Sequence, residues 1–299
     1  MKKQNTKTIS TLIQNETDIQ AMRELVNQFP CRASAFNLEE SLSIRSVRST
    51  TRLWWVDGKL IGFAFVDDYN NLRFEIDLQF SNEQLQNEII AWGLACMRDR
   101  NTKSREDNTL DASFSAYDTM QIEMLEKHGF NRERVRTLRY SRFLDKDLPV
   151  HALPAGFSLR HVGREHEVGH LVNLHRAAFG TEKMTVEKRL AIMRTPGYEQ
   201  ELDLVVTAPN AELGAFCICG LDEDYAEIGY SDPLGTHPRY QRLGLGSAII
   251  TAGMLALKKR GARVVELGTS SGNTAMQRLA EKLGFVVASE KLWFSKQVS

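Results

Sequence analysis

The sequence predicts a mixed α/β protein, with mixed sheets of the α+β kind, made of two tandem domains of similar topology. Both halves contain strand-like segments joined by polar turns, at residues 53–78 and 202–234. In both halves a helical segment that ends in Gly-Phe comes later, at 120–130 and 276–285. The same order of elements at half-length indicates a duplicated domain.

The boundary between the two domains is expected in LDKDLPVHALPAG, residues 144–156. Two prolines and a glycine interrupt both the helical and the strand periodicity there. Each domain is expected to end with a strand, at 135–143 and at 286–296. We therefore predict a first domain over residues 1–148 and a second over 149–299.

The composition is that of a soluble globular protein, with 42% hydrophobic and 25% charged residues. Lysine plus arginine (38) equals aspartate plus glutamate (38), which argues against nucleic acid or an anionic membrane as the partner. No run approaches the roughly 18 apolar residues of a membrane span. The first residues of the sequence lack the apolar core of a signal peptide.

The four cysteines, Cys31, Cys96, Cys217 and Cys219, are too few and too scattered for a disulfide framework. Strand alternation in AFCIC would place Cys217 and Cys219 on one face, which favours buried thiols over a metal pair. These features predict a protein of the reducing cytoplasm.

The segment QRLGLG, residues 241–246, predicts an anion-binding loop. It lies between an extended run that ends at Thr236 and a helix that begins near Gly244. Glycines just before a helix let backbone N–H groups converge, and the helix N-terminus adds positive potential. Arg239 and Arg242 beside the loop favour a phosphorylated ligand. Ile249 stands where a dinucleotide fingerprint would need its third glycine, and the Gly-Lys-Ser/Thr of a P-loop is absent.

From about Phe157 to Lys296, the order of elements and this loop resemble the GNAT superfamily of acyl-CoA N-acyltransferases. The family's pyrophosphate loop reads Gln/Arg-x-x-Gly-x-Gly. The resemblance implies acetyl-CoA as co-substrate and no metal. It implies that the cofactor is bound by Leu234, Gly235, Thr236, Gln241, Arg242, Leu243, Gly244, Leu245, Gly246, Ser247 and Asn273, of which 234–236 and Asn273 would face the pantetheine arm.

Pro233 supports the resemblance on physical grounds. Proline is tolerated in a sheet only at an edge or a bulge, and the family opens its sheet at this place to admit the cofactor. Regular alternation would put Tyr230, Asp232 and Leu234 on one face and Glu227 with Ser231 on the other. A bulge near Pro233 would switch these faces.

The first half resembles the same fold without a cofactor loop. Leu78 to Ile90 spans 12 positions, whereas the equivalent stretch from Leu234 to Ile250 spans 16. The remaining segment, SNEQLQNE, has no glycine and carries acids that would repel phosphate. We therefore interpret the first domain as a degenerate copy that supports structure or shapes the pocket.

The resemblance implies transfer of an acetyl group to a primary amine of a small molecule or peptide, by direct attack in a ternary complex. A base must take the ammonium proton, and Asp232 is the first candidate, followed by Glu227. A backbone N–H near Thr236 would serve as oxyanion donor. The family often has a Tyr as general acid in its last helix, where this chain has Ala280. Water, Ser271 or Tyr230 would have to replace it.

HEVGH, residues 166–170, matches the His-Glu-x-x-His pattern of zinc hydrolases. Arg176 stands where a third histidine would follow, and Gly169 inside the helix costs about 1 kcal/mol relative to alanine. We interpret His166 and His170 as half-exposed helix residues, although Glu182 or Glu187 could complete a zinc site. A zinc hydrolase and a non-catalytic acyl-CoA sensor thus stay open as alternatives. Exposed sheet edges would also permit a homodimer.

Overall fold

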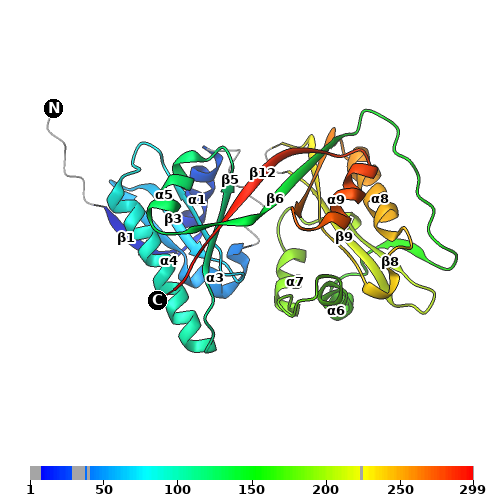
Figure 1. Cartoon of the computed structure of the whole chain (residues 1–299), viewed down its shortest axis with the longest axis horizontal. Helices are drawn as coiled ribbons and strands as arrows, with labels where there is room; N and C mark the ends of the chain where they lie inside the picture. Colours follow the sequence, from blue (N-terminus) through cyan, green and yellow to red (C-terminus); the bar gives the residue numbers. More distant parts are fainter. Residues whose placement is uncertain (1–7, 29–37, 39–40, 223–224, 299) are drawn as a thin grey trace. The chain divides into compact units, whose positions relative to one another are not determined.

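The computed structural model describes residues 8–28, 38, 41–222 and 225–298 (Figure 1). Cys31 therefore lies outside the described residues. The chain forms two compact units: unit 1 comprises Met1–Arg136 with Lys291–Ser299, and unit 2 comprises Thr137–Glu290. Each unit thus includes a strand segment from the other half of the sequence: residues 137–143 belong to unit 2, and residues 291–296 belong to unit 1. No helix among the described residues is long and apolar enough to cross a membrane.

Unit 1 contains a four-stranded antiparallel sheet in the order β1-β2-β3-β4, with helices on both faces. Its elements are β1 (Ile9–Leu12), α1 (Glu16–Asn27), α3 (Arg45–Thr50), β2 (Arg52–Val56), β3 (Lys59–Val66), β4 (Leu72–Ile76), α4 (Glu83–Ser104), β5 (Leu110–Ser115) and α5 (Thr119–Lys127). Alternation along β3 divides the core. Phe63 and Phe65 pack with α1, whereas Ala64 and Val66 pack with α4.

The sheet of unit 1 opens between β4 and β5. A single parallel bridge, Asn71 to Asp111, joins the two strands, and β4 and β5 belong to separate sheets beyond it. The partner of β5 within unit 1 is the end of β12 (Val286–Lys296), which pairs antiparallel from Lys291 to Lys296. β4 and β5 therefore diverge from one shared point.

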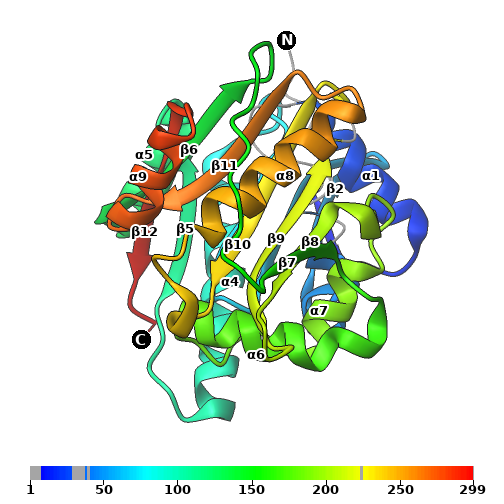
Figure 2. The same cartoon turned by 90° about the vertical axis from the view of Figure 1, so that its right-hand side faces the viewer.

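Unit 2 is a mixed sheet in the order β6-β11-β10-β9-β8-β7, covered on both faces by helices (Figure 2). Only the pairing between β10 and β11 is parallel among these described strands. Its elements are β6 (Asn131–Phe143, from Thr137), β7 (Ser158–His161), α6 (Val168–Phe179), α7 (Val186–Met193), β8 (Asp203–Thr207), β9 (Leu213–Leu221), β10 (Ile228–Thr236), α8 (Leu245–Lys259), β11 (Val264–Ser270) and α9 (Thr274–Lys282).

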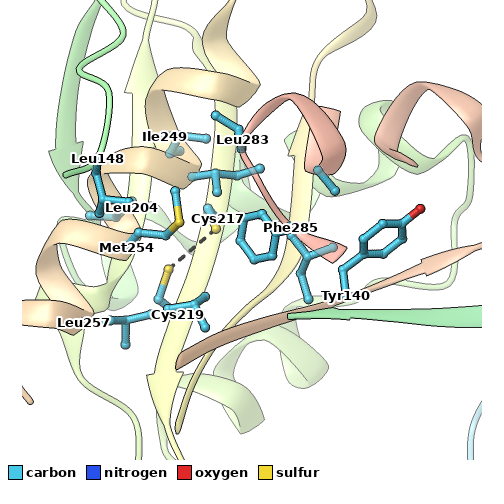
Figure 3. Packing of buried hydrophobic residues seen from close by; sticks show 14 of the residues in the cluster. Tyr140, Leu148, Leu204, Cys217, Cys219, Ile249, Met254, Leu257, Leu283 and Phe285 are labelled. Carbon is cyan, nitrogen blue, oxygen red and sulfur yellow. Dashed lines mark hydrogen bonds between the residues drawn. The ribbon is translucent and has the colours of Figure 1, made fainter. Parts of the chain in front are cut away.

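The two faces of β9 separate the two cores of unit 2. Cys217 and Cys219 face α8 and α9 with Met254 and Phe285 (Figure 3). Phe216 and Ile218 face α6 and α7. The two thiols are buried and their sulfurs lie 3.6 Å apart, which confirms the prediction of buried strand thiols.

Candidate functional site

The sheet of unit 2 opens between β10 and β11. The two strands pair in parallel only from Ile228 to Tyr230, opposite Val264 to Glu266. Beyond Tyr230, β11 continues along β6, and β10 continues along β9 as far as Thr236. Among the described strands, none pairs with the β11-facing edge of residues 231–236. This edge therefore offers backbone groups to an extended ligand.

A bulge in β10 lies at the opening. Ser231 pairs with Cys219 and Leu234 pairs with Cys217, so Asp232 and Pro233 together face one residue of β9. The peptide bond between Asp232 and Pro233 is cis. The expected regular alternation through Leu234 is therefore interrupted, and the alternative of a bulge near Pro233 is the one found.

The bulge also changes which side chains share a face. Ser231 contacts the buried thiol of Cys217, and Leu234 packs against the core under α8. Tyr230 pairs with Gly220, whose neighbours on β9 face the other way. Ser231 and Leu234 therefore face α8, and Tyr230 lies on the face of α6 and α7.

Two glycines make room for the candidate catalytic side chains. A Cβ on Gly268 of β11 would lie 3.0 Å from Oδ2 of Asp232, so the carboxylate of Asp232 lies against this glycine in the opening. A Cβ on Gly220 of β9 would overlap the hydroxyl of Tyr230, so the phenol lies across this glycine. Asp232 itself is solvent-exposed. A ligand that enters the opening can therefore reach its carboxylate.

Glu227 lies away from this opening. It is in the turn before β10, its side chain is 61% exposed, and its Oε2 lies 3.6 Å from Nη1 of Arg263. Asp232 lies five positions further along the chain, which corresponds to about 16 Å of extended strand at 3.3 Å per residue. The structure does not bring Glu227 and Asp232 together.

Two further charged residues lie on the same face of the opening. Glu266 pairs with Tyr230 across the parallel ladder, and Nη1 of Arg139 lies 3.1 Å from its Oε2. Arg139 also pairs with Gly268, against which Asp232 lies. Alternation in VVELGT would have indicated Glu266. The sequence held no signal for Arg139, because its strand comes from the first half of the chain.

His175 of α6 is a half-buried histidine on this side of the sheet that the sequence analysis also missed. Its ring lies 4.7 Å from that of Phe179 and 5.4 Å from that of Phe216, centroid to centroid. Burial, with a smaller contribution from the charge of Arg189, lowers the pKa of His175 to about 4. His175 is therefore neutral at physiological pH.

The loop before α8 presents bare backbone N–H groups. Gly244 is the N-cap, with φ +82°, and no side chain caps the helix. The first intrahelical bond runs from the N–H of Ala248 to the carbonyl of Gly244. The N–H groups of residues 245–247 thus have no acceptor within the helix. A Cβ on Gly244 would meet nothing within 4 Å, so open space lies before the helix terminus. The uncapped N-terminus of α8 is therefore suited to bind an anion such as a pyrophosphate.

The side chain of Arg239 forms an ion pair with Glu212, in the turn between β8 and β9. Its Nη2 lies 2.5 Å from Oε2 of Glu212, and the hydroxyl of Tyr240 donates to the same oxygen at 2.8 Å. Arg239, followed by Tyr240 and Asn210, lowers the pKa of Glu212 to about 2. Glu212 therefore competes with a phosphorylated ligand for the guanidinium group of Arg239. The side chain of Gln241 donates to the carbonyl of Thr236 at 3.4 Å, and Arg242 is exposed with φ +66°.

Asn273 is the N-cap of α9. Its Oδ1 accepts from the N–H of Met276 at 3.1 Å, so its oxygen is engaged while the amide NH₂ group keeps its donors. Ala280, further along α9, is fully buried in the core of unit 2. A tyrosine at position 280 would overfill this core, which gives a physical reason for the small residue.

HEVGH does not form the helix of a zinc hydrolase. His166 lies in a 3₁₀ turn, Glu165–Glu167, and His170 lies in α6, which begins at Val168. The carboxylate of Glu167 accepts from Arg160 at 3.0 Å and from the N–H of Gly163 at 2.7 Å. The two histidines thus belong to different elements, and the glutamate is held by Arg160 and Gly163. No group of three His, Cys, Asp or Glu suited to a metal occurs in the described part of the chain.

Residues 173–285 match the model of the Acetyltransferase (GNAT) family. The chain is also similar to two mycothiol acetyltransferases. The protein from Renibacterium salmoninarum is 28% identical over 54% of this chain and 51% of its own length. The protein from Kineococcus radiotolerans is 30% identical over 55% and 54%. The chain thus spans about half the length of the curated relatives it matches.

Two solved structures share the fold over nearly the whole chain. A GCN5-related N-acetyltransferase from Sphaerobacter thermophilus covers 97% of this chain and is itself covered to 96%, at 20% identity and TM-score 0.70. A tandem GNAT protein from the clavulanic acid biosynthesis pathway is covered to 99%, as is this chain, at 14% identity and TM-score 0.73. The predicted fold class, two tandem GNAT-like domains, is confirmed.

Proposed function

We propose that unit 2 transfers an acetyl group from acetyl-CoA to a primary amine, because residues 173–285 match the model of the Acetyltransferase (GNAT) family. The observation that carries this proposal is the opening between β10 and β11, next to an uncapped helix N-terminus. The first feature suits the extended pantetheine arm, and the second suits the pyrophosphate.

The cofactor contacts follow from these two features. The loop and first turn of α8 hold the pyrophosphate through Gln241, Arg242, Leu243, Gly244, Leu245, Gly246 and Ser247. The backbone of Leu234, Gly235 and Thr236 hydrogen-bonds the pantetheine arm at the unpaired edge of β10. The amide NH₂ group of Asn273 donates to the same arm from the other side of the opening.

The reaction is a direct attack of the acceptor amine on the thioester. Asp232 takes the proton of the acceptor ammonium, directly or through one water, and frees the nitrogen lone pair. The C–N bond forms, the C–S bond breaks, and the second proton of the nitrogen passes through water or Tyr230 to the leaving CoA thiolate. An N–H near Thr236 donates to the carbonyl oxygen as negative charge develops on it. Glu227 lies in the turn before β10, away from the opening and beside Arg263, so it is less well placed than Asp232 to act as the base.

A small-molecule amine is the first acceptor to test, because the relatives are named for mycothiol. Calorimetric titration of the full chain with acetyl-CoA is the first experiment, with one equivalent bound per chain as the expected result. A screen of amines for released CoA thiol then follows. Absence of acetyl-CoA binding would overturn the proposal.

A non-catalytic acyl-CoA sensor is the second candidate, because Ala280 is buried where the family often has its acid. A sensor and a transferase both bind acetyl-CoA. Only the transferase releases CoA thiol steadily when an amine is added, so the amine screen separates the two.

A further inference from the structure

The loop before α8, residues 241–244, has little burial of its own. All four of its residues are exposed. Arg242 and Gly244 have φ values of +66° and +82°, and a side-chain-bearing residue such as Arg242 rarely adopts such a conformation unless its surroundings fix it. The position of the loop therefore depends mainly on the residues at its two ends, Tyr240 and Leu245.

Both ends of the loop lie against the same glycine of β9. A Cβ on Gly214 would lie 3.3 Å from Cδ2 of Tyr240 and 3.4 Å from Cδ1 of Leu245. The N–H of His237 also donates to the carbonyl of Gly214 at 2.9 Å. Because Gly214 has no side chain, the tyrosine ring and the leucine pack directly on the backbone of β9. β9 lies inside the sheet, between β10 and β8, so it gives both ends of the loop a firm support.

The hydroxyl of Tyr240 reaches the turn between β8 and β9. It lies 2.8 Å from Oε2 of Glu212 and 3.2 Å from Oδ1 of Asn210. Oδ1 of Asn210 also accepts from the N–H of Glu212 at 3.3 Å, so the two acceptors are themselves linked. The ring of Phe157 meets that of Tyr240 edge-on, with centroids 5.7 Å apart. Tyr240 is therefore fixed both at its ring and at its hydroxyl.

Tyr240 and Arg239 have separable roles at this turn, although both contact Oε2 of Glu212. The side chain of Arg239 is 60% exposed, so it can turn toward a ligand phosphate. The ring of Tyr240 is partly buried and packs against the core of unit 2. If Arg239 leaves Glu212, Tyr240 still has the carboxylate of Glu212 and the amide oxygen of Asn210 as acceptors.

We propose that Tyr240 is a positioning residue of the acetyl-CoA site, anchored by Gly214 and by the turn at residues 210–212. The anchor sets the backbone N–H groups of residues 245–247 in one arrangement before the ligand arrives, so that less conformational entropy is lost on binding. This inference rests on the function proposed for unit 2. It adds a residue that acts on the cofactor through the loop.

The test is calorimetric titration of the full chain with acetyl-CoA. Tyr240→Ala removes the ring and the hydroxyl and is expected to lower the affinity about tenfold or more. Tyr240→Phe keeps the ring on Gly214 and loses one hydrogen bond, so it is expected to stay within about threefold of the wild type. Gly214→Ala puts a methyl group against both ends of the loop and is expected to lower the affinity severalfold, which keeps the test decisive if Tyr240→Ala does not fold.

Two further variants separate the anchor from other effects. Tyr225→Ala removes a 45% exposed tyrosine before β10, at the strand end opposite the loop, and should leave the affinity unchanged. Glu212→Gln keeps an acceptor for Tyr240, removes a negative charge near the phosphate site and releases Arg239, so it is expected to bind acetyl-CoA more tightly. A loss with Glu212→Gln as large as with Tyr240→Ala would mean that the ion pair of Arg239 holds the loop, and would refute the role of Tyr240.

Limited trypsin digestion of the ligand-free protein is the second measurement. Cleavage after Arg242 is expected to be faster in Tyr240→Ala than in the wild type and in Tyr225→Ala, because a released loop fits the protease more easily. An unchanged cleavage rate would contradict the anchor. No binding of acetyl-CoA by the wild type would overturn the function proposed for unit 2. Equal affinity in the wild type and in Tyr240→Ala would overturn the anchor and leave that function intact.

Discussion

Unit 1 and unit 2 each have a sheet that opens between two strands joined in parallel, β4 and β5 in one and β10 and β11 in the other. They differ at the helix that follows. α8 begins after a glycine with open space around it, whereas α4 begins with a capping asparagine and an acid. They differ also in the acidic side chain at the opening, an exposed aspartate in unit 2 and a buried glutamate, Glu75 of β4, in unit 1.

The difference shows that the opening and the phosphate site are separable parts of this fold. The opening is a property of strand pairing and persists in both units. The phosphate site depends on a few loop residues that leave N–H groups bare. A unit that lacks these residues keeps the opening between its strands but has a capped helix terminus in place of the phosphate site.

The largest expected effect follows from closing the phosphate site. Gly244→Glu puts a carboxylate into the open space before α8, at a φ of +82° that strains any side chain. Acetyl-CoA affinity is expected to fall at least 100-fold in calorimetry. Gly58→Glu is the matched control, because Gly58 is a unit 1 glycine with φ +79° and equally open surroundings. Equal loss in both variants would mean that the effect comes from backbone strain and not from the loop.

The next effect concerns the carboxylate in the opening. Asp232→Asn removes the proposed base while it keeps the shape of the side chain, and kcat is expected to fall about 100-fold, in the range typical of general-base removal. Loss of kcat with unchanged acetyl-CoA affinity is the expected pattern. Asp99→Asn, at an exposed residue of α4 in unit 1, is the control and should leave kcat unchanged. Glu227→Gln should lower kcat less than Asp232→Asn, and the reverse order would restore Glu227 as the base.

The sequence predicted the parts of this site that are local in the chain. QRLGLG indicated the uncapped helix terminus, and Pro233 indicated a sheet edge or a bulge, because glycine and proline act on their own backbone. The bulge changed which side chains share a face with Tyr230, and only the register to β9 decides that. Arg139 could not be predicted, since β6 belongs to the first half of the sequence and joins unit 2 in the fold. Glu75 reads as an ordinary alternating strand residue in LRFEIDL, and its burial depends on helices that precede it.

A smaller effect is expected from Gly268→Ala. The added methyl would lie 3.0 Å from Oδ2 of Asp232, so the carboxylate must move by a few tenths of an ångström. We expect kcat to fall about tenfold, since misplacement of a catalytic group by less than 1 Å is costly. Gly169→Ala, where a Cβ would meet nothing within 4 Å, is the matched control in the same unit. Unchanged kcat in Gly268→Ala would show that Asp232 does not act from the position described.

The smallest effect is a pH dependence of stability that belongs to unit 2. The pKa of His175 is lowered from 6.5 to about 4 in the fold, so between these pH values the unfolded chain binds a proton that the folded chain does not. Stability is therefore fully present above about pH 6.5, falls as the pH drops toward 4, and loses nothing more from this group below that. His175 is partly exposed, and solvent screening reduces the effect. In urea unfolding at pH 7.5 and 4.5, His175→Gln should lose less stability than the wild type, whereas His170→Gln, at an exposed position of the same helix, should lose as much. An equal loss of stability in all three proteins would mean that burial of His175 beside Phe216 does not lower its pKa in the folded protein.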